Sequence, residues 1–217
     1  MITRREFVAG SAALALTGTA LSALDWNFIG TAFAQNPSPA DILVAGPLGD
    51  EVQGKADAPV TIVEYASMTC GHCAAFHNKT YPVLKQRYID TGKVRYIMRE
   101  FPLDPLAAAG FMLARCAGPD KYYPMIEVLF QKQDQWAVQQ PIPPLTAIAK
   151  QAGFTQEKFE SCLSDQKILD GIEATRTRGS EKLGVNSTPT FFVNGKVLRG
   201  AVTIEDLEKE ILPAIKS

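Results

Sequence analysis

The pattern of apolar and polar residues predicts a strand–helix–strand unit in the first half of the chain. A nearly continuous apolar run at 60–66 is typical of a buried central strand, and alternating residues at 94–98 predict a second strand. The segment between them, 70–88, has the length and apolar spacing of a helix, which Pro82 should kink. A strand, a helix and a strand of these lengths indicate a parallel crossover connection.

A helical tract with no intervening strand follows, from about Pro105 to Leu183. Gly and Pro residues divide it at 118–119, at 141–144 and at Gly153, which predicts four or five short helices. Because the tract lies between predicted strands, it indicates a helical subdomain inserted into an α/β domain.

The end of the chain predicts a β-hairpin and a closing helix. The segments 190–193 and 196–198 have the composition of strands, and Asn194-Gly195 between them favours a tight hairpin turn. We expect the helix to begin near Thr203, because Asp206 three residues on completes a variant of the capping box.

The N-terminus has the pattern of an export signal. Arg4 and Arg5 precede an Ala-rich apolar stretch at 7–24, and Ala32-Phe33-Ala34 forms an A-x-A cleavage signal before Gln35. The two arginines fit a twin-arginine signal, although an ordinary secretory leader can carry them too. An uncleaved anchor is the weaker interpretation, since the stretch falls short of the roughly 20 apolar residues that a span needs. We therefore expect a periplasmic protein whose mature chain begins near residue 35.

Composition fits one domain and gives no sign of a nucleic-acid partner. The 217 residues are 46% hydrophobic, and 22 basic against 23 acidic residues give a net charge of −1. The expected organisation is a leader at 1–34, an irregular segment at 35–59 with room for a brief edge strand, and an α/β domain at 60–217. The helical insertion interrupts that domain at about 105–183.

The candidate chemistry lies in Cys70-Gly71-His72-Cys73, directly after the first strand. Two thiols at this spacing can close into a disulfide, and the first stands where helix N–H groups and the macrodipole favour an anion. The dipole accounts for about one unit of pKa lowering, so we expect His72 to supply a direct donor to the Cys70 sulfur. A stabilised thiolate makes the disulfide easier to reduce and the protein a stronger oxidant.

Metal binding is the main competing interpretation of these residues. A structural zinc site needs four ligands, and Cys70, His72, Cys73 and His77 lie too close together to form two separated pairs. Covalent haem attachment is excluded because Ala74 stands where a histidine is needed. We expect no metal and no cofactor, and we interpret His77 as an ordinary residue on the helix face.

Glu64 interrupts the apolar strand six residues before Cys70. In an apolar interior its pKa would be raised, so it could serve disulfide exchange as an acid or base. Alternation along the strand could equally turn it toward solvent.

Two further cysteines, Cys116 and Cys162, remain after Cys70 and Cys73 are assigned to each other. In an oxidising compartment they are expected to form a structural disulfide between two helices of the insertion, and the alternative is two separate buried thiols.

Together these motifs, with Thr188-Pro189 leading into the hairpin, resemble the thioredoxin fold. The insertion and the leader make the chain similar to the DsbA-type periplasmic thiol oxidases, especially the branch with Gly71 rather than Pro in the motif. The resemblance implies that Cys70 attacks and that a buried Cys73 resolves.

The resemblance also implies roles for residues outside the motif. Pro189 would be cis and packed on the active-site disulfide, with the backbone of Thr188 pairing with substrate. Glu64 would be the buried carboxylate, and Cys116 with Cys162 would match a second disulfide of some members.

The expected function is that of a monomeric thiol:disulfide oxidoreductase that oxidises exported proteins with reduced thiols. The resemblance implies a membrane-bound, quinone-linked thiol oxidase as the partner that reoxidises it. An isomerase or a reductase is the alternative, although residues 35–59 are too few for the dimerisation domain of bacterial isomerases. A client-binding chaperone and a metal carrier of the same fold are the non-enzymatic alternatives.

Overall fold

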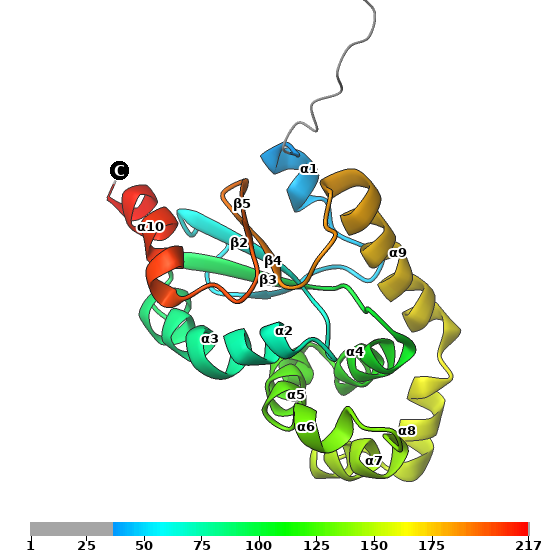
Figure 1. The fold of residues 1–217 in the computed structure, drawn as a ribbon. Coiled ribbons are helices and arrows are strands. Elements are labelled where there is room, and N and C mark those ends of the chain that lie inside the picture. The colour runs from blue at the N-terminus through cyan, green and yellow to red at the C-terminus, as the bar shows by residue number, and fades with distance from the viewer. Residues whose placement is uncertain (1–36, 217) are drawn as a thin grey trace, which may run out of the picture. The chain divides into compact units, whose positions relative to one another are not determined.

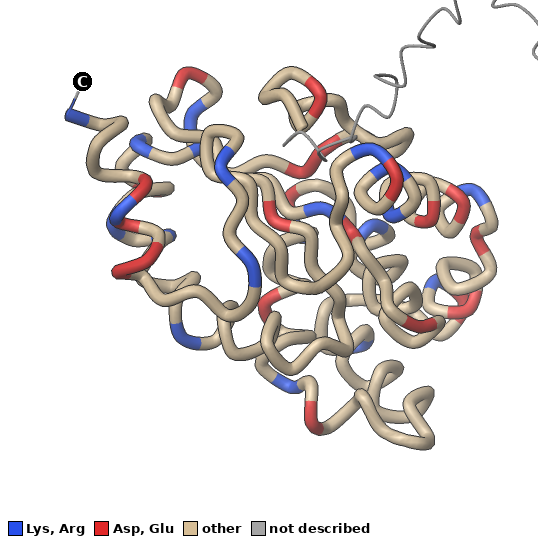
Figure 2. The backbone as a smooth tube through the Cα atoms, turned by 45° about the horizontal axis from the view of Figure 1, so that its top comes forward, with Lys and Arg blue, Asp and Glu red and all other residues tan. Residues whose placement is uncertain are grey.

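The computed structural model describes residues 37–216 (Figure 1). The predicted leader, with Arg4, Arg5 and the cleavage site at Ala34/Gln35, lies outside the described residues. Within 37–216, none of the helices is long and apolar enough to cross a membrane. Basic and acidic residues are interspersed over this part of the chain (Figure 2).

A single five-stranded sheet forms the centre, in the order β1-β3-β2-β4-β5. Its strands are β1 (Glu51–Gln53), β2 (Val60–Ala66), β3 (Val94–Glu100), β4 (Thr190–Val193) and β5 (Lys196–Arg199). The central pair β2 and β3 is parallel, as the crossover pattern predicts, and the other three pairings are antiparallel. The predicted Asn194-Gly195 turn is confirmed, with φ values of 46° and 92°.

Both faces of the sheet are covered, so alternate residues of β2 enter two different cores. Val63 and Tyr65 pack in a cluster with Ile42 and Leu183. Residues of the other parity, among them Ile62, belong to the larger core on the opposite face. Every residue of β2 except Thr61 is therefore buried.

The larger core is covered by the helix that follows β2 and by the closing helix. The first winds without a break through α2 (Gly71–Ala75), a π-helical turn (Phe76–Thr80), α3 (Tyr81–Leu84) and a second π-helical turn (Lys85–Ile89). Pro82 lacks an N–H group for the α-helical bond, and the first π-turn stands immediately before it. The closing helix α10 (Ile204–Ile215) starts at the predicted capping box of Thr203 and Asp206.

The helical insertion has six helices between Pro105 and Leu183, where the sequence predicts four or five. They are α4 (Pro105–Ala117), α5 (Pro119–Gln131), α6 (Gln133–Trp136), α7 (Ile142–Gln151), α8 (Gln156–Leu163) and α9 (Gln166–Leu183). The extra helix is the single turn α6, too short to give a periodic pattern. The last helix, α9, is long and runs from the insertion back to the sheet (Figure 1).

The segment before β2 is more regular than predicted. The helix α1 (Pro39–Leu43) is capped by Ser38, and Ile42 at its buried side closes the smaller core. The short strand β1 forms the expected edge of the sheet, at Glu51–Gln53.

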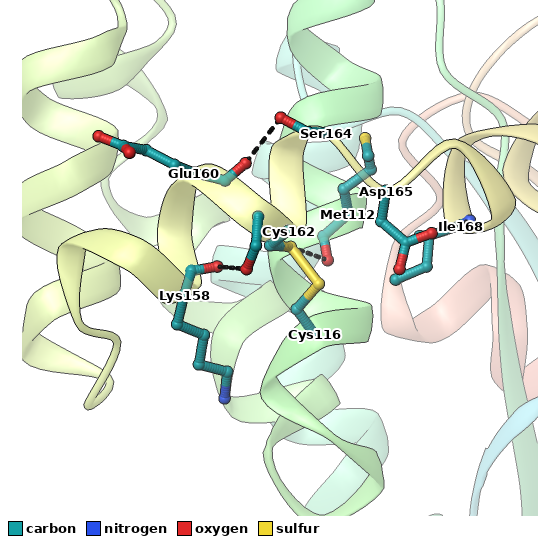
Figure 3. The surroundings of a disulfide bond; sticks show 9 residues. Met112, Cys116, Lys158, Glu160, Cys162, Ser164, Asp165 and Ile168 are labelled. Carbon is teal, nitrogen blue, oxygen red and sulfur yellow. Dashed lines mark hydrogen bonds between the residues drawn. A yellow bond between two sulfur atoms is a disulfide. The ribbon is translucent and has the colours of Figure 1, made fainter.

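A disulfide between Cys116 and Cys162 joins α4 to α8, with their Cα atoms 6.1 Å apart (Figure 3). The Cys162 sulfur also lies 3.2 Å from the Met112 carbonyl. The bond therefore links the first helix of the insertion, which follows β3, to the fifth.

Candidate active site

The two motif cysteines lie where β2 ends and the long helix begins. Cys70 is the N-cap residue of α2, and its N–H group donates to the Ser67 carbonyl at 3.1 Å. Its side chain is half-buried, whereas Cys73, one turn along the helix, is fully buried. Both thiols are free in this structure. An incoming sulfur can therefore reach Cys70 but not Cys73.

The loop before β4 lies against Cys70. The Thr188-Pro189 peptide bond is cis, and the Cys70 thiol donates to the Thr188 carbonyl at 3.3 Å. The Thr188 hydroxyl is buried without a protein partner among the described residues. Two segments 118 residues apart in the chain are thus brought together at the reactive sulfur.

Hydrogen bonds to the sulfur lower the pKa of Cys70 to about 5. The largest cause is the Cys73 thiol, which donates to the Cys70 sulfur; partial burial opposes it. The contact with Thr188 and the backbone N–H groups of Cys73 and His72 lower the pKa further. At neutral pH the thiolate is therefore the main form of Cys70.

Cys73 has the opposite environment. Burial raises its pKa far above the ordinary value, and the proton it shares with Cys70 and the nearby charge of Glu64 raise it further. The pair therefore consists of one thiolate and one thiol that keeps its proton.

His72 does not act as the sequence suggests. Its side chain is exposed, and its contribution to the pKa of Cys70 comes from the backbone N–H group. The direct donor is Cys73, because its thiol stands on the inner side of the same helical turn. Gly71 is exposed and meets no neighbour that a Cβ atom would touch.

The insertion holds the loop in front of Cys70 at two points. The Thr69 hydroxyl donates to Asp104 at 2.5 Å, and the other oxygen of Asp104 caps α4. The Gln133 amide donates to the carbonyls of Met68, at 2.8 Å, and Cys70, at 3.1 Å. These contacts fix the backbone that presents the thiol.

Glu64 is fully buried and faces the helix that carries the cysteines. One of its carboxylate oxygens accepts from the Tyr96 hydroxyl and lies 3.0 Å from Nε2 of His77. Its neighbours on the adjacent strands, Met98 and Phe191, are apolar. The carboxylate thus lies inside the larger core, behind Cys73.

Sequence reasoning missed Asp104 and Gln133. Its interpretation of His77 as an ordinary residue on the helix face is wrong, because the ring is buried against Glu64. The Asp104-Pro105 step has the pattern of a helix start, which could have identified a cap but not its bond to Thr69. No local pattern pairs His77 with Glu64, because the contact depends on how the helix rotates over the sheet.

The four residues considered as zinc ligands do not come together. His72 is exposed, and His77 points to Glu64. Within residues 37–216 there is no group of three His, Cys, Asp or Glu side chains placed to hold a metal ion.

The family comparison agrees with this geometry. The sequence profile described as Thioredoxin matches residues 48–212. The chain belongs to the thioredoxin family. Among solved members, α-DsbA1 of Wolbachia pipientis is 31% identical, with a TM-score of 0.73 over 81% of this chain and 98% of that chain. BdbD of Bacillus subtilis, in its oxidised form, is 25% identical, with a TM-score of 0.66 over 84% of this chain and 97% of that one.

These relatives place the chain among the DsbA-like proteins of the thioredoxin family, and they confirm the predicted fold with its inserted helices. A Rickettsia bellii protein, provisionally named a protein-disulfide oxidoreductase, is 38% identical over 148 residues, which are 67% of this chain and 57% of that protein. The chain spans between 55% and 61% of the length of its five rickettsial relatives. Disulfide bond formation protein D of Bacillus subtilis is 27% identical over 77% of this chain and 78% of its own.

Proposed function

We propose that the protein is a thiol oxidase that transfers the Cys70–Cys73 disulfide to client proteins. A client thiolate attacks the Cys70 sulfur, a mixed disulfide forms, and Cys73 leaves with the electron pair and takes up a proton. A second client thiolate then attacks the client sulfur of the mixed disulfide and releases Cys70 as a thiolate. The client gains a disulfide and loses two electrons, and the protein gains both.

The observation that carries this proposal is the lowered pKa of Cys70, about 5. Relative to an ordinary thiol of pKa 8.5, such a thiolate stabilises the reduced state by at most about 2.7 kcal/mol at pH 7. For a two-electron couple this raises the reduction potential by up to about 60 mV. The true value is smaller, because Cys70 is half-exposed and solvent screens its donors. A raised reduction potential favours transfer of the disulfide to clients, and therefore their oxidation.

Two measurements test the proposal together. Wild-type protein should introduce disulfides into a reduced, unfolded substrate, and Cys70→Ser should not. The reduction potential of the pair, from equilibration with glutathione, should lie well above the roughly −270 mV of thioredoxin. A potential near that of thioredoxin, or activity in Cys70→Ser, would contradict the oxidase assignment.

The clients and the reoxidising partner follow from the same proposal. Clients are exported proteins with reduced thiols, which reach Cys70 beside the Thr188 backbone. A membrane-bound, quinone-linked thiol oxidase removes the electrons. The leader pattern around Arg4 and Arg5 supports a periplasmic location for the mature chain. We propose that this mature chain is a monomer. Fractionation of cells, with the N-terminus of the recovered protein determined, tests the location and the cleavage site.

A further inference from the structure

Disulfide exchange requires a proton to enter and leave the most buried sulfur of the site. Cys73 has no exposed surface, and it alternates between a thiol in the reduced state and a sulfur without a proton in the disulfide. During exchange the client is bonded to Cys70, the more exposed of the two sulfurs, and covers that side of the pair. A proton path on another side of Cys73 is therefore needed.

The Glu64–His77 pair is the buried polar group behind Cys73. Nε2 of His77 lies 3.0 Å from the Glu64 carboxylate, and both side chains have at most 1% exposure. Among residues 37–216, His77 is the basic residue that pairs with Glu64. The neighbours of Glu64 on the two adjacent strands, Met98 and Phe191, are apolar. The Tyr96 hydroxyl supplies the other contact. A proton on Glu64 therefore has His77 as its direct exchange partner.

Each end of this pair has one buried atom without a protein partner. One is Oε1 of Glu64, and the other is Nδ1 of His77. The atoms that join the two residues, Oε2 and Nε2, are both in use. The free atoms are thus the two ends of a carboxylate–imidazole chain, which is the arrangement that proton transfer along it requires.

His77 also lines a cavity of about 180 Å³ between its own helix and α5. Glu64 does not line this cavity, so His77 is the member of the pair that borders it. The ring is held by stacking on Phe130, with centroids 4.3 Å apart. It belongs to the π-helical turn Phe76–Thr80, which alters the direction of its side chains relative to an α-helix.

We propose that His77 is a positioning residue that carries protons between Glu64 and solvent through this cavity. When Cys73 attacks a mixed disulfide at Cys70, its proton passes to Glu64, then through the imidazole to water in the cavity. The sulfur–sulfur bond to Cys73 forms, and the electron pair leaves on the other sulfur. The reverse transfer protonates Cys73 when a client opens the disulfide.

Other titratable groups face the pair from each packed element. They are Cys73 from α2, Tyr81 from α3, Tyr96 from β3, and Tyr123 and Glu127 from α5. Burial raises the pKa of each of the three tyrosines, so these hydroxyls keep their protons and cannot replace the imidazole at neutral pH. Lys85 and Asp90 line the outer part of the cavity.

The experiment separates attack by Cys70 from resolution by Cys73. Reduced protein is mixed with excess DTNB in a stopped-flow instrument, and release of TNB is followed. The first phase, attack by the Cys70 thiolate, depends on DTNB concentration. The second phase, attack by Cys73 on the Cys70–TNB disulfide, does not, and it releases the proton. In His77→Gln we expect the second phase to slow at least about tenfold at pH 7, with the first phase within about twofold of wild type.

The pH dependence distinguishes proton transfer from a structural effect. With His77→Gln, hydroxide must remove the proton, so the second phase should rise about tenfold per pH unit, more steeply than in wild type. In His77→Ala, free imidazole should enter the enlarged cavity and restore the second phase. Tyr81→Phe is the matched control, because Tyr81 lines the same cavity, and the variant keeps the ring beside His77 and loses only the hydroxyl that donates to Gln53. Both of its phases should stay within about twofold of wild type.

Two outcomes would overturn the inference. One is a second phase in His77→Gln with the rate and pH dependence of wild type. If His77→Gln fails to fold, the other is a His77→Ala protein in which imidazole has no effect. The inference rests on the proposed exchange chemistry at Cys73, but both phases occur whichever direction the protein favours in the cell. Failure of client oxidation would therefore leave the two phases intact and be recognised separately.

Discussion

The two cysteine pairs of this chain differ in almost every physical respect. Cys70 and Cys73 lie on one helical turn, with donors directed at the outer sulfur. Cys116 and Cys162 are 46 residues apart on two helices, and the polar contact of their sulfurs is with the Met112 carbonyl. These differences favour reduction of the Cys70–Cys73 disulfide and retention of the Cys116–Cys162 disulfide.

Approximate magnitudes support this contrast. By the loop-closure relation, a disulfide over 46 residues stabilises the fold by about 4 kcal/mol, and one over four residues by about 2 kcal/mol. At the short pair, thiolate stabilisation of at most about 2.7 kcal/mol opposes closure. The two effects at the short pair are similar in size, so folding changes the tendency of that disulfide to close only slightly relative to the unfolded chain.

The largest expected effect separates the pairs by activity. Cys73→Ser should lower client oxidation on the order of 1000-fold, because the protein then has no disulfide to donate. The double variant Cys116→Ser/Cys162→Ser should stay within about threefold of wild type, since distant sites act nearly independently. Both are measured as disulfide formation in a reduced substrate. Comparable losses in the two proteins would remove the functional distinction.

For the free energy of unfolding, we expect the Cys116–Cys162 pair to contribute more than the Cys70–Cys73 pair. Cys116→Ser/Cys162→Ser should lower the free energy of unfolding by about 2 to 4 kcal/mol, measured with urea on oxidised protein, in which the Cys70–Cys73 disulfide is closed. Cys70→Ser/Cys73→Ser serves as the control and should lose less, at most about 2 kcal/mol, because the loop that its disulfide closes is short. Equal losses would mean that loop length does not decide how the two pairs contribute.

A third expected effect depends on pH and belongs to the active-site pair. The pKa of Cys70, about 5, is below that of an unfolded thiol, so the folded reduced protein binds fewer protons. Its extra stability is fully present above about pH 8.5 and is lost as pH falls through 5. The change is at most about 1.4 kcal/mol per pH unit, reduced by solvent screening.

Unfolding of reduced and oxidised protein at several pH values measures this effect. The stability of the reduced form relative to the oxidised form should decrease on acidification and level off below about pH 5. Taking the difference between the two forms cancels most contributions from other groups. A difference that does not change between pH 4 and 8 would show that Cys70 ionises as an ordinary thiol.

Much of the fold could be predicted because its signals are local. The apolar run at 60–66 gives β2, and Asn194-Gly195 gives the hairpin turn. The capping box at Thr203 gives the start of α10. Each signal lies within a few residues of the element that it predicts, so the pattern alone was enough.

The parts that could not be predicted depend on packing between distant segments. Whether Glu64 faced solvent could not be decided from alternation, because both faces of the sheet are covered. His72 was expected to donate through its imidazole, but the helical turn places the Cys73 thiol and backbone N–H groups at the sulfur instead. Gln133 reaches the active-site loop from the single-turn helix α6, which has no sequence signal of its own.

The smallest expected effect lies inside the short cysteine loop. Gly71 opens α2 at a conventional negative φ, and a Cβ atom there would meet nothing within 4 Å. Gly71→Ala should therefore stabilise the protein by about 0.4 to 1 kcal/mol, by restricting the unfolded chain. Gly179→Ala is the matched control, because its Cβ would lie 2.7 Å from the Tyr65 ring, and it should be destabilising. Destabilisation by Gly71→Ala in urea titrations would show that the loop between Cys70 and Cys73 is constrained by more than the helix that it begins.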